Sequence, residues 1–353
     1  MTLQLDQLAA DAPIRRRGRY LATVLANVYP CREHNKLTFG VPGFPASAPG
    51  QFVQVKCRTP DGAPLGDTPD REHDWSPGAA ASLAGEIAQP DLFRPTPILR
   101  RPFSIAGRRD TPGGPEIDLI NRDIGPGTNW LHGLKPGDEV DLIGPLGNTF
   151  TLPGPGEVAL LVGGGVGIPP MIYLAQALAR LNEGLPDGER RTAVAFCGAL
   201  SLDLLPLTLT DTAPPPPAGR SDEAAQALPN VAEFADFGFP TVLSTDDGTY
   251  GYHGRVTEPL VRYLDRFFAD SWEIGSKRPT IYTCGPEPMM KAVAAVALER
   301  GLRCEVAVER AMACGMGTCQ SCVIRQKSAH ERGWSYKLAC TDGPVFEAST
   351  LLW

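Results

Sequence analysis

The stretch VALLVGGGVGIPPMIYLAQALA, residues 158–179, decides the fold of this 353-residue chain. It carries no charged residue and is long enough to cross a bilayer as a helix. Four glycines and two adjacent prolines lie in its middle, however, and would break such a helix. A buried strand, a glycine turn and a helix with proline in its first turn explain the pattern better, because first-turn N–H groups have no intrahelical partner. The stretch therefore predicts a strand–turn–helix unit and no membrane span.

Downstream of this unit, strand-like runs alternate with helix-like runs. The strand-like runs are TAVAFCG (192–198), TVLSTDD (241–247) and TIYTCG (280–285), and the helix-like runs are RVTEPLVRYLDRFF (255–268) and EPMMKAVAAVALERG (287–301). Such alternation indicates parallel βαβ units wound into one sheet. We expect residues 154–303 to form a Rossmann-like α/β domain. Residues 205–230, rich in Pro, Ala, Gly and Asp, are typical of an exposed insertion, to which no function is assigned.

Upstream, the chain has the pattern of an antiparallel β-barrel or sandwich. Short β-like runs are separated by Gly and Pro turns, at 20–29, 36–41, 51–57, 101–107, 116–122 and 138–144. One helix-like stretch, TNWLHGL (128–134), interrupts them. We expect residues 1–153 to form this β domain, with residues 58–98 as a second insertion. Residues 304–353 contain a cysteine cluster and no long helix-like run, which predicts a small third domain.

Composition excludes several classes of function. The net charge of −7 and the lack of long basic runs argue against a nucleic-acid partner, since such proteins concentrate Lys and Arg on one face. The nine cysteines are an odd number, and the N-terminal residues show no apolar leader. We therefore expect a reducing, cytoplasmic location, in which clustered thiols indicate metal or redox chemistry.

The cysteine cluster is the most specific chemical signal. Cys314, Cys319 and Cys322 follow the spacing C-x4-C-x2-C of plant-type [2Fe–2S] proteins, and Cys340 supplies a fourth thiolate. Glycines between them allow the loop to wrap closely around an inorganic cluster. A structural zinc site is the alternative, since four thiolates also suit tetrahedral zinc. Zinc sites usually show two C-x2-C pairs, and the second half here has one cysteine, so we favour the iron–sulfur cluster.

Three glycine-marked loops follow predicted strands of the α/β domain. They are Gly163, Gly164, Gly165 and Gly167 in GGGVG, the TDDG turn at 245–248, and Cys284, Gly285 and Pro286 in CGPEPMM. The carboxyl ends of parallel strands line one crevice, so these loops together favour a nucleotide site. GGGVG lacks the GxGxxG spacing and is equally consistent with a plain tight turn. Cys284 alone is more typical of a small buried apolar residue than of a functional one.

The β domain offers a different set of groups. In RPFS (101–104) an arginine can clamp a phosphate and a serine can bond a ring nitrogen, and Gly127 and Thr128 in GPGT can present backbone N–H groups to a diphosphate. Each signal is weak alone. Taken in isolation, Arg101 is more typical of a surface charge and Thr128 of a helix N-cap.

Taken in order, these motifs resemble a known family. RPFSI, GPGT, GPLGNTF (144–150), GGGVGIPP, TDDGTYG, CGPEPMM and CGMGTCQSC with LACTDGPVF are similar to the electron-transfer subunit of class 1B dihydroorotate dehydrogenase, in the ferredoxin–NADP reductase superfamily. The resemblance implies an FAD domain, an NAD(H) domain and a [2Fe–2S] domain. It also implies a heterotetramer with two FMN-containing catalytic subunits, and electron transfer from dihydroorotate to NAD⁺ in pyrimidine biosynthesis.

The resemblance also assigns residues by motif. FAD would be held by Arg101, Pro102, Phe103, Ser104, Ile120, Asn121, Arg122, Gly127 and Thr128; NAD(H) would face Gly163, Gly164, Gly165, Gly167, Cys284, Gly285 and Pro286; the cluster ligands would be Cys314, Cys319, Cys322 and Cys340. Asn121 departs from the tyrosine that is frequent in the family, and 17 residues separate Cys322 from Cys340, a longer arm than expected.

Electron counting explains why three cofactors would occur together. NAD(H) exchanges two electrons as hydride and an iron–sulfur cluster exchanges one, so a flavin that supports both modes must stand between them. Hydride transfer needs no protein acid or base, and none of the five histidines lies in a motif. Two alternatives remain: a reductase component for another acceptor, such as an oxygenase, sulfide or bifurcating complex, and a zinc-bearing protein without redox activity. The sequence leaves NAD versus NADP open.

Overall fold

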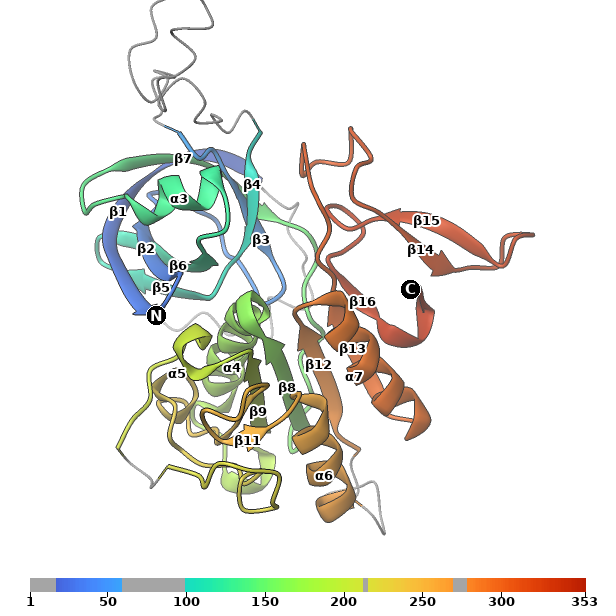
Figure 1. The fold of residues 1–353 in the computed structure, drawn as a ribbon. Helices are drawn as coiled ribbons and strands as arrows, with labels where there is room; N and C mark the ends of the chain where they lie inside the picture. The colour runs from blue at the N-terminus through green and yellow to red at the C-terminus, as the bar shows by residue number, and fades with distance from the viewer. Residues whose placement is uncertain (1–16, 59–98, 212–214, 269–277) are drawn as a thin grey trace, which may run out of the picture.

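The computed structural model describes residues 17–58, 99–211, 215–268 and 278–353 of the chain. These residues form a seven-stranded antiparallel sheet, a second seven-stranded sheet that is mainly parallel, and a three-stranded sheet near the C-terminus (Figure 1). The predicted architecture, with a β-barrel domain, an α/β domain and a small C-terminal unit, is confirmed. The expected insertion at 58–98 lies outside the described residues except for Arg58.

The first sheet curls into a partly open barrel. Its strand order is β4-β3-β7-β1-β2-β6-β5, with all pairs antiparallel, and β4 also contacts β6 across the opening. The elements are β1 (Gly18–Cys31), β2 (His34–Gly40), β3 (Phe52–Val55), β4 (Arg101–Ser104), β5 (Gly107–Thr111), β6 (Gly114–Arg122), α3 (Pro126–His132) and β7 (Glu139–Leu146). Alternate residues such as Val24, Leu37 and Leu119 fill the interior, and Leu131 anchors α3 to this core.

The second sheet forms the α/β domain. Its order is β11-β10-β9-β8-β12-β13-β16, parallel except for β16. The strands are β8 (Val158–Gly164), β9 (Thr192–Ala199), β10 (Thr241–Thr245), β11 (Tyr252–His253), β12 (Thr280–Cys284), β13 (Arg303–Ala307) and β16 (Val345–Glu347). The chain winds outward from β8 in one direction and then returns to place β12 on its other side. The carboxyl ends of β8 and β12 therefore flank the switch point where ligands bind in such sheets.

Helices cover both faces of this sheet. Leu160 and Val162 pack in one core with residues of α6 and α7, whereas Ala159 and Leu161 pack in another with residues of α4 and α5. The helices are η2 (Gly165–Gly167), α4 (Ile168–Asn182), η3 (Asp187–Glu189), η4 (Leu202–Leu204), α5 (Ala232–Ala235), α6 (Thr257–Phe268) and α7 (Glu287–Glu299). None of the helices within the described residues combines the length and apolarity that a membrane crossing needs.

The C-terminal region contributes to two sheets. Its own sheet has the order β15-β14-β17, and β16 pairs with β13 at the edge of the α/β sheet. The remaining elements are β14 (Val323–Lys327), β15 (Trp334–Leu338), η5 (Ala348–Thr350) and β17 (Leu351–Leu352). The expected domain boundary at 303/304 falls inside β13, so the third unit is continuous with the second.

Segment 205–230, expected to be an exposed insertion, is partly built into the α/β domain. Leu205, Leu207 and Ala224 are buried, at 2%, 5% and 1% exposure. Isolated bridges pair Leu209 with Val231 and Leu228 with Thr241. Apolar side chains at the ends of this Pro-rich segment therefore hold it against the sheet, which composition alone does not reveal.

A buried carboxylate ties the strands of the barrel together. Asp118 on β6, at 4% exposure, accepts hydrogen bonds from Arg109 at 2.7 and 2.9 Å and from Thr38 at 2.7 Å. Lys36 lies 3.4 Å away. Burial alone raises the pKa of Asp118, but these partners outweigh it and leave the pKa below its ordinary value.

We expect Asp118→Asn to lower the free energy of unfolding at neutral pH by about 1–3 kcal/mol, because Arg109 and Lys36 lose their anion; their partial exposure limits the loss. A carboxylate with a lowered pKa stabilises the fold above its ordinary value, here 3.8, and this contribution is lost as the pH falls through the folded value. Denaturant unfolding at about pH 7 and about pH 3 measures both effects. The native chain should lose more stability on acidification than the variant; equal losses would contradict the assignment.

Candidate functional site

Along the chain, the four predicted cluster ligands follow β13 and precede β16, in the orange-to-red part of the ribbon (Figure 1). Cys314, Cys319 and Cys322 lie on the loop before β14, and Cys340 follows β15. The hairpin of β14 and β15 brings the two ends together, because Ala339 N donates to Cys322 O at 3.0 Å. Cys322 and Cys340 are buried, whereas Cys319 is exposed.

The cysteine loop directs backbone donors at sulfur. Cys314 Sγ accepts hydrogen bonds from the N–H groups of Met316 and Cys319, each at 3.4 Å. Gly315 and Gly317 make this curl possible, with φ values of +67° and +87° that other residues rarely adopt. Hydrogen bonds, first with Ser321 and then with Cys314, lower the pKa of Cys319 to about 6. N–H groups aimed at sulfur favour anionic thiolates, the form that binds iron.

The thiols interact with one another: Cys319 with Cys314, and Cys340 with Cys322 and also with Cys314. Burial and then the contact with Cys322 raise the pKa of Cys340 to about 12. Over the described ranges, no three His, Cys, Asp or Glu side chains converge as a site for a single metal ion. A [2Fe–2S] cluster takes four thiolates, two on each iron, and these four cysteines supply that number, so the donor set fits such a cluster.

The two glycine loops at the switch point are in direct backbone contact. A Cβ atom on Gly167 would lie 2.2 Å from Cys284 O and 2.4 Å from Gly285 N. A Cβ atom on Gly164 would lie 2.5 Å from Met289 Sδ, and one on Gly285 would lie 3.0 Å from Gly164 O. The structure therefore brings together GGGVG and CGP, which are more than a hundred residues apart, and only glycine permits the approach.

The remaining residues of these loops have distinct positions. Gly163 lets α4 begin close to β8, since its Cβ would lie 2.9 Å from Ile168 Cα. Gly165 faces open space with φ +53°, and Pro286 is the N-cap of α7. Cys284 is 9% exposed, and burial raises its pKa to about 12, as for a core thiol. The TDDG turn follows β10, which β9 separates from β8.

The predicted flavin motifs meet at the open side of the barrel. A Cβ atom on Gly127 would lie 3.3 Å from Arg101 Cγ, so the first turn of α3 packs on the stem of this arginine. Arg101 is exposed, and no hydrogen bond or ion pair with another described residue engages its guanidinium. Thr128, the third residue of α3, accepts from the N–H of Ile124 and of Gly125 through Oγ1, each at 3.0 Å, whereas the N-cap of the helix is Gly125. Along β4, Pro102 lies opposite Gln54, Phe103 opposite Val53 and Ser104 opposite Phe52.

The end of β6 places its three predicted residues differently. Ile120 is buried in the core shared with α4. Asn121, at 2% exposure, has no hydrogen-bond partner for either amide atom among the described residues. Arg122 donates to Glu33 at 2.7 and 2.9 Å. Arg122 is thus held by a carboxylate that no sequence motif indicated.

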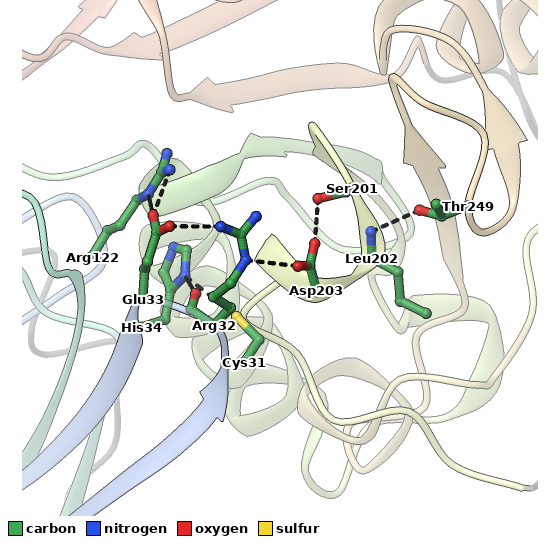
Figure 2. A network of polar contacts seen from close by, with 9 residues as sticks. All are labelled: Cys31, Arg32, Glu33, His34, Arg122, Ser201, Leu202, Asp203 and Thr249. Carbon is green, nitrogen blue, oxygen red and sulfur yellow. Dashed lines mark hydrogen bonds and ion pairs between the residues drawn. The ribbon is translucent and has the colours of Figure 1, made fainter.

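Figure 2 shows that this carboxylate belongs to a network between two domains. Glu33 also accepts from Arg32 at 2.9 Å, and Arg32 donates to Asp203 of η4 at 2.7 Å. Arg32 N donates to Asp203 O at 2.9 Å as well. The β1–β2 turn therefore links Arg122 to the α/β domain. Sequence analysis missed Arg32, Glu33 and Asp203 because they lie in no motif and far apart along the chain.

Comparison with known proteins identifies the family. Residues 309–352 match the model of the iron–sulfur cluster binding domain of dihydroorotate dehydrogenase B. The chain is 31% identical over 87% of its length to the dihydroorotate dehydrogenase B (NAD(+)) electron transfer subunit of Desulforamulus reducens, of which it covers 87%. It is 34% identical over 72% of its length to the subunit of the same name from Geobacillus thermodenitrificans, of which it covers 81%. The chain belongs to this family.

Solved structures of other proteins share the fold of this chain. An NADH-dependent reduced ferredoxin–NADP oxidoreductase superposes with a TM-score of 0.62 at 22% identity, over 94% of this chain and 90% of that one. An Amycolatopsis cytochrome P450 reductase superposes with a TM-score of 0.51 at 21% identity, over 81% of this chain and 67% of that one. The predicted resemblance, the oxidoreductase class and the iron–sulfur interpretation are confirmed; the assignment of individual FAD and NAD(H) contacts stays a prediction.

We expect Gly167→Ala to destabilise this member of the family by about 1–3 kcal/mol, since its Cβ would meet backbone atoms of the CGP loop that cannot rotate away. Gly188→Ala is the control, because a Cβ there meets nothing within 4 Å. Thermal unfolding of both variants measures the difference. Equal melting temperatures would show that the two loops are not packed as described.

Proposed function

We propose that the chain passes electrons between NAD(H) and a partner dehydrogenase through FAD and a [2Fe–2S] cluster. The observation that carries this function is a complete set of four cysteines in a chain 31% identical, over 87% of its length, to a named electron transfer subunit. FAD supplies the exchange between two-electron and one-electron transfer when bound. The protein's contribution is to hold the cofactors in fixed positions.

On the NAD(H) side, the chain supplies backbone and no acid or base. The loops after β8 and β12 meet at glycines, which carry no side chains, so a dinucleotide can approach backbone N–H groups at the switch point. Cys284, at the end of β12, is a neutral thiol because burial raises its pKa. The relatives are NAD(+) electron transfer subunits, which favours NAD over NADP.

On the FAD side, Arg101 is the residue best suited to a diphosphate. Its guanidinium is exposed beside the first turn of α3, and Gly127 brings that turn close to it. Ser104, at the end of the same strand, would bond the flavin ring, and Asn121 offers a buried amide whose partners are missing within the described chain. Glu33 would orient Arg122 toward the cofactor.

The finer assignment concerns the partner and the substrate. We propose that the partner is an FMN-containing dihydroorotate dehydrogenase catalytic subunit, two copies of which assemble with two copies of this chain. Electrons from dihydroorotate oxidation would then reach NAD⁺ during pyrimidine biosynthesis. A cytoplasmic location fits the nine cysteines, all of which are free thiols in the structure.

The first test is the absorption spectrum of anaerobically purified protein before and after NADH, with flavin, iron and sulfide assayed on the same sample. We expect about one flavin and about two irons per chain, with both sets of bands bleached by NADH. Cys322→Ser should lose the iron and keep an NADH-reducible flavin, whereas Cys31→Ser, remote from the loop, should keep both. Bound zinc without iron, or a flavin that NADH does not reduce, would reject the proposed function.

A second test addresses the partner. Co-expression with an FMN-containing dihydroorotate dehydrogenase catalytic subunit should give one complex with two copies of each chain, which forms NADH when dihydroorotate and NAD⁺ are added. With Cys322→Ser, NADH formation should fall at least about a hundredfold, since the one-electron carrier is lost. Oxidation of dihydroorotate by an artificial acceptor should persist. Separate elution of the two wild-type chains would exclude this partner while leaving the cofactor assignment intact.

A further inference from the structure

One buried polar side chain faces the cysteine loop from the barrel. On β3, Val53 and Val55 point into the barrel core, and Phe52 packs in the core that includes Cys322. Gln54 alternates with the two valines and so leaves the barrel on the opposite face. It is fully buried, at 0% exposure. β3 therefore presents one amide group, shielded from water, to the C-terminal unit.

This amide lies directly against the residue that follows the first cysteine. A Cβ atom on Gly315 would lie 2.6 Å from Gln54 Nε2 and 2.7 Å from Gln54 Cγ. Gly315 has no Cβ, so the Gln54 side chain occupies the space beside its backbone. The requirement for glycine at 315 thus has two causes, the positive φ and the presence of Gln54.

Neither polar atom of Gln54 has a hydrogen-bond partner within the described chain. A buried amide left unsatisfied costs about 1–3 kcal/mol for each lost bond, so such groups are rare without a reason. By contrast, Gln51 three residues earlier accepts from Ala48 N and donates to Gly147 O. The protein can therefore satisfy a buried glutamine at this end of the barrel, yet it leaves Gln54 free to bond a group that the chain does not itself contain.

We propose that Gln54 Nε2 donates a hydrogen bond to a sulfur of the [2Fe–2S] cluster and thereby raises the reduction potential of the cluster. This inference rests on the proposed function. The backbone N–H groups of Met316 and Cys319 already serve Cys314 Sγ from within the loop, and Gln54 supplies a donor from another domain. Reduction adds one negative charge to the cluster, and a donor to its sulfur stabilises the more negative state.

The position of Gln54 also makes its hydrogen bond sensitive to the contact between the barrel and the C-terminal unit. Its neighbour across the strand pair is Pro102, in the RPFS stretch expected to hold FAD. Gln54 thus lies between the flavin strand and the cluster loop, and its hydrogen bond depends on the two domains staying together. Gln54 is a positioning and tuning residue, and no step of the chemistry takes place on it.

The experiment is a redox titration of the complete wild-type and variant proteins, with the reduced cluster followed by its electron paramagnetic resonance signal and the flavin by absorbance. For Gln54→Leu, the ratio of reduced to oxidised cluster at a fixed potential should fall roughly threefold to tenfold, while the flavin titrates as in wild type. Gln54→Met, which keeps the length of the side chain but has no N–H donor, should lower the ratio to a similar extent.

Gln326→Leu is the matched control, since its amide on β14 already donates to Thr350 at 2.9 Å and its loss should leave the cluster potential unchanged. Unchanged cluster potentials in both Gln54 variants, or equal shifts of cluster and flavin, would overturn the proposal. Gln54→Met keeps the test decisive if the leucine variant does not fold. If the wild-type protein contains iron, sulfide and flavin but the Gln54 variants leave the cluster potential unchanged, this inference alone is rejected. A wild-type protein without iron would reject it together with the proposed function.

Discussion

The structure depends on the antiparallel pairing of β16 with β13. β13 leads the chain into the cysteine loop and β16 returns it, so the pairing from Glu305–Glu347 to Ala307–Val345 fixes both ends of the C-terminal unit to the α/β sheet. Asn148, between the barrel and that sheet, completes the anchor. Its side chain donates to Val345 O at 2.8 Å and accepts from Val345 N at 2.9 Å. One amide and one strand pair thus hold three units in fixed positions, which electron transfer between separate cofactors requires.

Local sequence patterns were sufficient for most of the architecture. Alternating apolar residues marked the barrel strands, and the glycine–proline break at 163–170 marked the first βα unit, because both signals act within a few residues. The cysteine spacing predicted the cluster for the same reason: three of the four predicted ligands lie on one loop. The glycines of GGGVG and CGP were identified separately, and the structure explains them jointly by the close approach of Gly167 to the CGP backbone.

The features that sequence analysis missed all depend on contacts between distant segments. β16 is three residues long and pairs with a strand some forty residues earlier, too short a signal to place it in the α/β sheet. Arg32 and Asp203 are ordinary surface charges in sequence, and only the docking of two domains makes them partners of the same network. Gln54 had the pattern of an outward polar residue in a strand; it is buried because the C-terminal unit covers that face.

The barrel contacts each of the other two units with a different part of its surface. Toward the α/β domain, Arg108 N donates to Gln176 Oε1 at 3.0 Å and Tyr173 donates to Ser47 O at 2.6 Å. Toward the C-terminal unit, β3 presents Phe52 and Gln54. The barrel, which carries the predicted FAD motifs, is therefore in contact with both neighbours, as an electron path with FAD between NAD(H) and the cluster requires. The cluster loop borders the barrel at β3, whereas β13, β16 and the ion pair of Arg310 with Glu287 of α7 tie the C-terminal unit to the α/β domain, so a change on β3 should alter the cluster without altering the NAD(H) loops.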